Sequence, residues 1–210
     1  LVELTRGKFV VDVGAGYEPF PTASEYVDWK RWDAMDPTKP LRILDLEEDP
    51  LPYKDKEVDF LVCRHIIEDL HYPFRLLREI HRVAKAGWIE TPSPLAEYAR
   101  WTSGNPCRGY PHHRSFVGML SSGVLAVIPK LPIIEMDKED APGIIRALQR
   151  SRWNWNSYLL WEGTFAVMKP SANPYTKEYL ATLEQMVREV ETSEAMRQQI
   201  TGATVGAGKG

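Results

Sequence analysis

Short apolar runs separated by turn-forming residues constrain the fold of this chain more than any other feature of its sequence. The runs are continuous rather than alternating, which is the pattern of strands in a sheet that is covered on both faces. They lie at residues 9–13, 26–27, 41–44, 58–62 and 87–89. Because the longer connection from Ile66 to Ala84 has a helical period, the sequence predicts an α/β fold with a parallel sheet.

Turn and capping residues predict the remaining elements. A helix is expected to begin near Tyr72-Pro73 and another near Ser115, and a long charged helix is expected from about residue 174 to 199. Two closing strands are expected at 158–160 and 164–168, joined by the turn Glu162-Gly163. Residues 1–200 are expected to form a single domain, and the small residues of 201–210 a flexible tail.

Charge, hydropathy and cysteine content narrow the partners and the compartment. The 210 residues carry a net charge of −3 with both signs mixed, so we expect no nucleic-acid partner. No stretch approaches the roughly 18 apolar residues of a membrane span, and the first residues lack the order of a signal peptide. Cys63 and Cys107 have neither zinc-site spacing nor a disulfide framework, which favours a soluble protein of the reducing cytoplasm. Because the chain opens almost directly into a strand without an initiator methionine, we expect a domain cut from a longer polypeptide.

The first predicted strand ends in the most informative motif, Asp12-Val13-Gly14-Ala15-Gly16. Two glycines directly after a buried strand let the backbone turn sharply and approach a ligand without side-chain obstruction. The next strand ends at Asp28, whose carboxylate can accept hydrogen bonds from the two hydroxyls of a ribose. Gly-x-Gly alone is often only a tight turn, but the two motifs together point to one nucleoside.

Further motifs follow in a fixed order: Leu44-Asp45-Leu46-Glu47, Leu51-Pro52-Tyr53, Val58-Asp59-Phe60, His65-Ile66-Ile67-Glu68-Asp69-Leu70 and Arg82-Val83-Ala84-Lys85-Ala86-Gly87. With them the sequence resembles the type 11 class I methyltransferases. In that family a D-x-x-x-x-L-P-F loop precedes an fD-x-V strand, an H-V-L-E-H-L segment and a helix that ends in R-V-L-K-P-G-G. The resemblance covers about residues 8–95 and is thin beyond them.

The resemblance implies a Rossmann-like class I methyltransferase fold, with a mostly parallel seven-stranded sheet and an antiparallel closing strand. It implies S-adenosyl-L-methionine as cofactor and S-adenosyl-L-homocysteine as product, with the cofactor half at about 1–95 and a substrate-facing half at about 96–200. The implied cofactor contacts are Asp12, Gly14 and Gly16 under the methionine part, Asp28 at the ribose, Asp45 and Leu46 at the adenine, and His65 near the sulfonium. Two alternatives stay open, since Asp45 can simply cap a turn and His65 can be a packed histidine.

The sequence departs from the family pattern after the second glycine. Tyr17-Glu18-Pro19 stands where the third glycine is common, and eleven residues separate Gly16 from Asp28. That link is too short for a full first helix and a return, so we expect a shortened first helix, as in a compact subgroup that resembles glycan-assembly enzymes. The missing glycine also argues against a nicotinamide dinucleotide, which needs a glycine and a helix N-terminus for its pyrophosphate.

Methyl transfer to a hydroxyl needs a group that removes the acceptor proton. The catalytic candidates are Glu90, at the end of the fifth predicted strand, the pair His112-His113, and His65. Glu90 can equally pair with Arg114, and the two histidines can be a polar helix N-terminus. A divalent metal on His112, His113 and Glu90 is a further alternative, but adjacent histidines usually point in different directions, so no metal site is predicted.

The substrate candidates are aromatic and amide residues, together with one arginine: Tyr110, Arg114, Trp153, Asn154 and Trp155. Flat apolar faces beside amide groups can bind a sugar ring by stacking and by hydrogen bonds to its hydroxyls, although Trp101, Trp161 and their neighbours can also be plain core.

The leading interpretation is therefore an O-methyltransferase for a sugar hydroxyl, with rhamnose at the end of a glycan as one acceptor, acting beside glycosyltransferase modules. Methylation of a small metabolite, a quinone or a peptide amine is the first alternative, because the fold and cofactor site do not choose the acceptor. A non-catalytic cofactor-binding module of a multidomain protein is the second.

Overall fold

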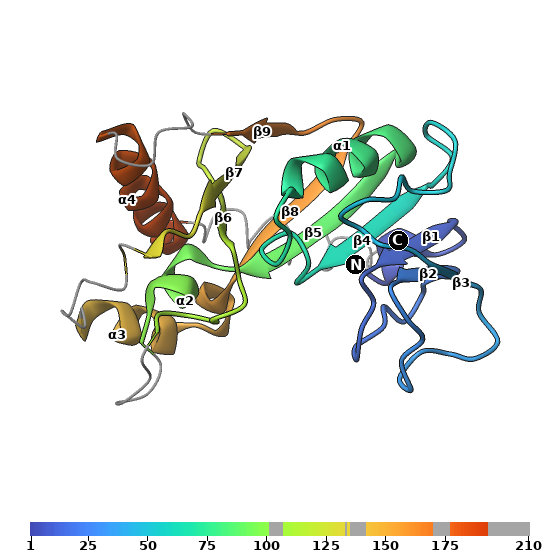
Figure 1. Cartoon of the computed structure of the whole chain (residues 1–210), viewed down its shortest axis with the longest axis horizontal. Helices are drawn as coiled ribbons and strands as arrows, with labels where there is room; N and C mark the ends of the chain where they lie inside the picture. Colours follow the sequence, from blue (N-terminus) through green and yellow to red (C-terminus); the bar gives the residue numbers. More distant parts are fainter. Residues whose placement is uncertain (101–106, 133, 135–141, 170–176, 193–210) are drawn as a thin grey trace, which may run out of the picture.

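A central six-stranded sheet organises the computed structural model, which describes residues 1–100, 107–132, 134, 142–169 and 177–192 (Figure 1). Its strand order is β3-β2-β1-β4-β5-β8, in which the first five strands are parallel and β8 is antiparallel to β5. The strands are β1 (Val10–Val13), β2 (Glu25–Asp28), β3 (Leu41–Ile43), β4 (Phe60–Arg64), β5 (Ala86–Pro92) and β8 (Asn156–Glu162). The predicted α/β fold and its antiparallel closing strand are confirmed, with six sheet strands in the described part of the chain where seven were expected.

The direction in which strands are added reverses between β1 and β4. The chain passes from β1 outward to β2 and β3, and then returns to place β4 and β5 on the other side of β1. At such a switch point the loops beyond the carboxyl ends of the strands diverge and leave a crevice, where open α/β sheets bind ligands. The fold thus predicts a site at the ends of β1, β2 and β4.

The link between β1 and β2 contains turns and no helix, so even the shortened first helix that was expected is absent. The face of the sheet that a first helix would cover is packed instead by loop side chains. Phe20, Ala23 and Met35 are buried there against Val10 and Tyr26. This face therefore retains a closed hydrophobic layer although the helix is missing.

Helix α1 (Pro73–Val83) covers the opposite face of the sheet. Proline at its first turn suits a position whose N–H has no partner inside the helix. Its buried side chains, Leu76, Leu77, Ile80 and Val83, share one cluster with Val11, Val13 and Leu61 of the strands. The predicted helix start at Tyr72-Pro73 is confirmed.

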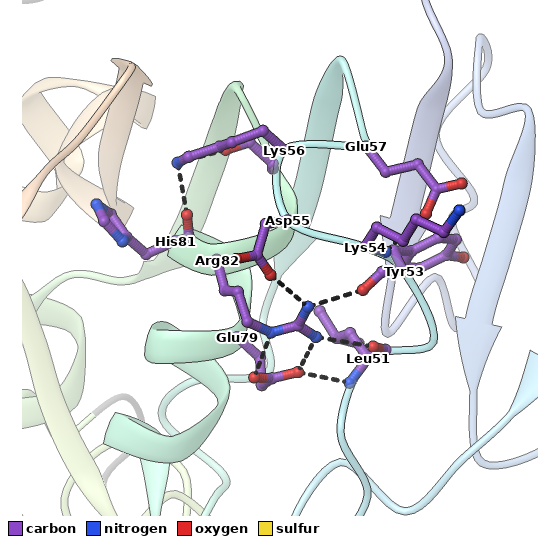
Figure 2. A network of polar contacts seen from close by, with 10 residues as sticks. Leu51, Tyr53, Lys54, Asp55, Lys56, Glu57, Glu79, His81 and Arg82 are labelled. Carbon is purple, nitrogen blue, oxygen red and sulfur yellow. Dashed lines mark hydrogen bonds and ion pairs between the residues drawn. The ribbon is translucent and has the colours of Figure 1, made fainter.

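Arg82, in the last turn of α1, fixes the loop that leads into β4 (Figure 2). Its guanidinium donates to the carbonyl oxygens of Leu51 and Tyr53, at 3.0 and 2.8 Å, and to the carboxylates of Glu79 and Asp55. A planar group with five donors can satisfy both backbone and carboxylate oxygens at once. One side chain thus connects the 51–55 loop to the helix that covers the sheet.

The second half differs from the prediction at Ser115, where a helix start was expected. Residues 115–119 form strand β6 (Ser115–Met119), which pairs with β7 (Val124–Pro129), and β7 pairs in turn with β9 (Ala166–Met168). Gly123, with a φ of 79°, allows the tight turn between β6 and β7. The predicted strands at 158–160 and 164–168 exist as β8 and β9, but they belong to different sheets.

Helices gather around this second sheet, away from β1, β2 and β3 (Figure 1). They are α2 (Pro94–Tyr98), α3 (Pro142–Arg150) and α4 (Lys177–Thr192). Two short 3-10 helices, η1 (Glu3–Thr5) and η3 (Arg152–Trp155), are also present in the described residues. The long helix expected at 174–199 is described over 177–192, and the expected tail at 201–210 lies outside the described residues. None of the helices in the described ranges is both long and apolar enough to cross a membrane.

Candidate active site

The loop after β1 is shaped by its two glycines. Gly14 and Gly16 have φ values of 70° and 52°, in the left-handed region that side chains disfavour. A Cβ atom on Gly14 would stand 2.1 Å from Cγ1 of Ile66, so the space beside the loop would also be lost. The loop therefore keeps its backbone accessible at the carboxyl end of the sheet, as the motif predicted.

Asp12 lies beneath this loop and is almost fully buried. Its Oδ2 accepts a 2.6 Å hydrogen bond from the amide of Phe20, whereas its buried Oδ1 has no hydrogen-bond partner in the described part of the chain. Burial raises the pKa of Asp12 to about 6, although the Phe20 amide and the charge of Arg64 oppose the shift. A buried carboxyl with spare acceptor capacity suits a ligand that carries positive charge, such as a sulfonium with its α-ammonium group.

Asp28, at the end of β2, binds three donors of the protein itself. Its Oδ2 accepts from the amide of Gly16 at 3.0 Å, and its Oδ1 accepts from the amide of Trp29 and the indole of Trp32. A carboxylate has about four acceptor positions, so little capacity is left for a ribose. The ribose contact stays a prediction, and Asp28 has in addition a role in holding the glycine loop.

Two adjoining cavities follow the carboxyl ends of the strands. The first, of about 600 Å³, extends along β3 and is lined by the expected adenine neighbours Asp45 and Leu46. The second, of about 720 Å³, is lined by Gly16 and His65. Residues that line both cavities are Gly14, Asp28, Trp29, Ile66 and Asp69. The expected cofactor residues thus lie along one continuous groove, with Asp12 buried below it.

The alternative role considered for Asp45 is also present. Its Oδ1 accepts a 2.9 Å hydrogen bond from the amide of Glu47, so the side chain caps its own turn while it lines the first cavity.

His65 borders the second cavity in a strained conformation, with a φ of 55°. Its Nδ1 lies 3.5 Å from Oε1 of Glu68, and its Nε2 lies 3.8 Å from Oε1 of Glu90. Burial lowers the pKa of His65, but the two carboxylates outweigh that effect and raise it above the usual value. About half of the side chain is exposed, so His65 can meet a ligand in the cavity.

Glu90 of β5 stands behind His65 in a small polar network. Its Oε1 accepts a 2.6 Å hydrogen bond from the side-chain amide of Asn156, and its Oε2 accepts from the indole of Trp88. The sequence left open an ion pair between Glu90 and Arg114. The observed contacts instead connect Glu90 to β8 and to its own strand, β5. Glu90 is thereby fixed in a position that orients His65.

His112 and His113 correct the expectation that adjacent histidines point apart. Their ring centroids lie 4.4 Å apart, and the two Nε2 atoms lie 3.8 and 3.7 Å from the same atom, Oδ1 of Asp69. His112 lines the second cavity, whereas His113 is buried and contacts Oε1 of Glu97 at 2.6 Å. Glu97 was considered in the sequence only as a structural partner of Arg100, whereas Asp69 could have been selected because it replaces the second histidine of the H-V-L-E-H-L pattern.

The predicted substrate residues are dispersed. Tyr110 stacks beside His113, at 4.6 Å between ring centroids, and Trp153 packs edge-on against Tyr158. Asn154 is buried and donates to the carbonyl of Ala147, and Trp155 packs in the cluster of α2 and α3, so both fill structural places. Arg114 lines a different groove, which Arg75 and Arg78 share.

The remaining aromatics divide in the same way. Trp161 is core and Trp101 lies outside the described residues. Tyr17, Trp29 and Trp32, which the sequence analysis did not select, line the second cavity.

Comparisons with known proteins agree with this geometry. Residues 12–89 match a family model described as a methyltransferase domain, of type 11. A comparison with curated proteins found no relative of the chain.

Solved structures are distant matches. A Bacillus subtilis protein is 20% identical, with 41% of this chain and 44% of that chain covered and a TM-score of 0.32. A SAM-dependent methyltransferase from Archaeoglobus fulgidus is 22% identical, with 53% of this chain and 58% of that chain covered and a TM-score of 0.41. An S-adenosylmethionine-dependent methyltransferase from Mesorhizobium loti is 15% identical, with 88% of this chain and 86% of that chain covered and a TM-score of 0.39. The chain thus spans about half the length of the first two structures. At such low identities and TM-scores the three structures add nothing to the topology described above.

The match over 12–89 ends within β5 and contains the glycine loop, Asp28, Asp45 and His65. Residues 12–89 are thus similar to a methyltransferase domain, and S-adenosylmethionine is the cofactor that this similarity implies.

Proposed function

We propose that this chain is an S-adenosylmethionine-dependent O-methyltransferase that acts on a sugar hydroxyl. The observation that carries the proposal is the second cavity, whose wall contains both the glycine loop and His65, with Glu90 behind His65 at 3.8 Å. A methyl donor over the loop and a base for the acceptor would then meet in the same space. Such proximity is the main requirement of a displacement reaction between two bound molecules.

The reaction that we assign to this cavity is methyl transfer to a hydroxyl group. The cofactor supplies a methyl group bound to a positively charged sulfur. When bound over the glycine loop, the cofactor would supply its methyl group to the acceptor oxygen, and the electron pair of the carbon–sulfur bond would stay with sulfur. His65 takes the proton of the hydroxyl, and the carboxylate of Glu90 at 3.8 Å stabilises the imidazolium that results. The products are a methyl ether and S-adenosylhomocysteine.

The sugar acceptor is supported by the aromatic rim of the second cavity, which we define as Tyr17, Trp29 and Trp32. Tyr17 and Trp29 are exposed by 75% and 64%, and the ring centroids of Tyr17 and Trp32 lie 4.2 Å apart. Exposed aromatic faces beside a cavity stack against the apolar faces of sugar rings. A deoxysugar such as rhamnose, in which a methyl group replaces a hydroxymethyl group, offers an apolar face of this kind and is the acceptor that we propose.

The test is calorimetric titration with S-adenosylmethionine, followed by a transfer assay with isotopically labelled methyl groups. The acceptor series contains rhamnosides, glucosides, a quinol and a peptide amine. Binding with transfer to glycosides, and strongest transfer to rhamnosides, is expected. Transfer only to the quinol or the amine would replace the sugar proposal, and cofactor binding without any transfer would leave a non-catalytic binding module.

His65→Gln and Glu90→Gln should lower kcat by about 10²- to 10⁴-fold and about 10-fold, respectively, with little change in the Kd of the cofactor. His81→Gln is the matched control, because His81 lies on α1 and contacts Thr164 away from both cavities. Unchanged kcat in His65→Gln would remove His65 as the base.

A further inference from the structure

We propose that Asp69, His112 and His113 form a binding site for a divalent transition-metal ion in the wall of the second cavity. The three residues come from two segments that are 43 positions apart in sequence, and each offers one ligand atom within 4.8 Å of the others. His112 and Asp69 also line the cavity that holds His65. The site would thus face the space assigned to the acceptor.

The distances suit a metal ion of ordinary size. Oδ1 of Asp69 lies 3.8 Å from Nε2 of His112 and 3.7 Å from Nε2 of His113. A point equidistant from the three atoms lies within about 2.4 Å of each, and metal–nitrogen and metal–oxygen bonds are about 2.0–2.2 Å long. Movements of a few tenths of an ångström would therefore complete the coordination without a change of rotamer.

The carboxylate behind His113 is arranged as in metal-binding histidines. Nδ1 of His113 lies 2.6 Å from Oε1 of Glu97, whose other oxygen accepts a 2.9 Å hydrogen bond from Lys130. When Nδ1 donates its proton to Glu97, Nε2 carries the lone pair, and this atom lies 3.7 Å from Oδ1 of Asp69. A carboxylate that fixes the tautomer of a ligand histidine is the usual outer partner in metal sites.

Asp69 supplies a second, independent observation. Its Oδ1 is buried and makes no hydrogen bond to the described part of the protein, although it is the atom on which both imidazoles converge. A buried carboxylate oxygen without a hydrogen-bond donor is costly, and a cation removes that cost. In the neutral form His113 offers this oxygen only a lone pair, because its proton is directed to Glu97.

Two imidazoles and one carboxylate select the kind of ion. This ligand set suits Zn²⁺, Mn²⁺, Fe²⁺ or Co²⁺, whereas Mg²⁺ and Ca²⁺ prefer oxygen ligands alone. Three protein ligands on one side would leave further positions open toward the cavity. We assign these positions to the acceptor hydroxyl, an assignment that rests on the proposed function. A bound metal would lower the pKa of this hydroxyl before its proton passes to His65.

The experiment titrates metal-free protein with CoCl₂, followed by visible absorption, and with ZnCl₂, followed by calorimetry. One ion per chain is expected. His112→Gln, a change at an exposed side chain, and Asp69→Asn should each weaken binding more than 10-fold, and Glu97→Gln by about 10- to 100-fold. His71→Gln is the control, since His71 also contacts a carboxylate, Glu47 at 3.1 Å, and should leave the affinity unchanged.

Absence of binding in the wild-type protein, or equal affinity in His112→Gln, Asp69→Asn and the wild type, would overturn the proposal. Circular dichroism of each variant separates a lost ligand from a lost fold. These results need no methyl acceptor, so they stand whether or not sugar methylation is observed. If binding is found but added metal leaves transfer to glycosides unchanged, only the catalytic assignment of the ion fails.

Discussion

The amide of Gly16 donates a 3.0 Å hydrogen bond to Oδ2 of Asp28, so the residue that was expected to hold the ribose also holds the glycine loop. Asp28→Ala would leave this amide, the amide of Trp29 and the indole of Trp32 without their acceptor. We expect the Kd of S-adenosylmethionine to rise more than 10-fold and the free energy of unfolding to fall by about 1–3 kcal/mol.

Calorimetry and urea unfolding measure the two effects. Asp36→Ala is the control, because the carboxylate of Asp36 accepts its hydrogen bonds from the amide and hydroxyl of Thr38, within its own exposed turn. An unchanged Kd in Asp28→Ala would remove Asp28 from the cofactor site, and an unchanged free energy of unfolding would remove its role in the loop.

Asp12 predicts a pH dependence of stability. Its pKa is about 6 in the folded protein and 3.8 for an ordinary aspartate, so the folded state holds the proton more tightly than the unfolded state between these values. Stability from this group is therefore present at low pH and is lost as the pH rises from about 4 to about 6, by at most about 3 kcal/mol. Asp12→Asn abolishes the titration, so its stability relative to the wild type should be higher at pH 7.5 than at pH 4.5.

Urea unfolding of both proteins at the two pH values provides the measurement. The difference between the proteins is the quantity of interest, because the other titrating groups contribute equally to both. A difference that does not change with pH would contradict the raised pKa of Asp12.

The raised pKa of His65 predicts how kcat depends on pH on the acidic side of the profile. Because Glu68 and Glu90 raise its pKa above the usual value, kcat should rise with pH through a midpoint above 6.5. Glu90→Gln removes one of the two carboxylates, so the midpoint should move to lower pH. A pH–kcat series on the two proteins tests this, and a midpoint that does not move would show that Glu90 does not interact electrostatically with the base.

The central sheet could be predicted because the information for it is local. Strands such as 10–13 and 60–64 are buried almost throughout, and burial on both faces produces the continuous apolar runs seen in the sequence. Chain length alone excluded a full first helix, since eleven residues cannot form a full helix and return, but the shortened helix that was expected is also absent. Glycines at 14 and 16 marked the loop because their positive φ values restrict the choice of residue.

The second half was less predictable because its elements depend on distant partners. Strand β6 was mistaken for a helix, and its identity is set by pairing with β7, which in turn pairs with β9 some forty residues later. The convergence of Asp69 with His112 and His113 has the same origin. The amides of Arg114 and Ser115 bind the carbonyl oxygen of Glu68, which places the two histidines beside Asp69.

The hydrogen bonds of Arg82 are expected to stabilise the loop before β4. Arg82→Met keeps the apolar stem but leaves the carbonyl oxygens of Leu51 and Tyr53 and the carboxylate of Glu79 without their donor. We expect the free energy of unfolding to fall by about 1–3 kcal/mol, because these oxygens belong to partly buried groups. Arg188→Met is the control, since Arg188 pairs with Glu184 where both side chains are mostly exposed, and it should cost less than about 1 kcal/mol. Urea unfolding measures the loss of free energy of unfolding in each variant. Equal losses would mean that Arg82 acts as an ordinary surface charge. The loop that carries Leu51 into the core would then be held in position by apolar packing alone.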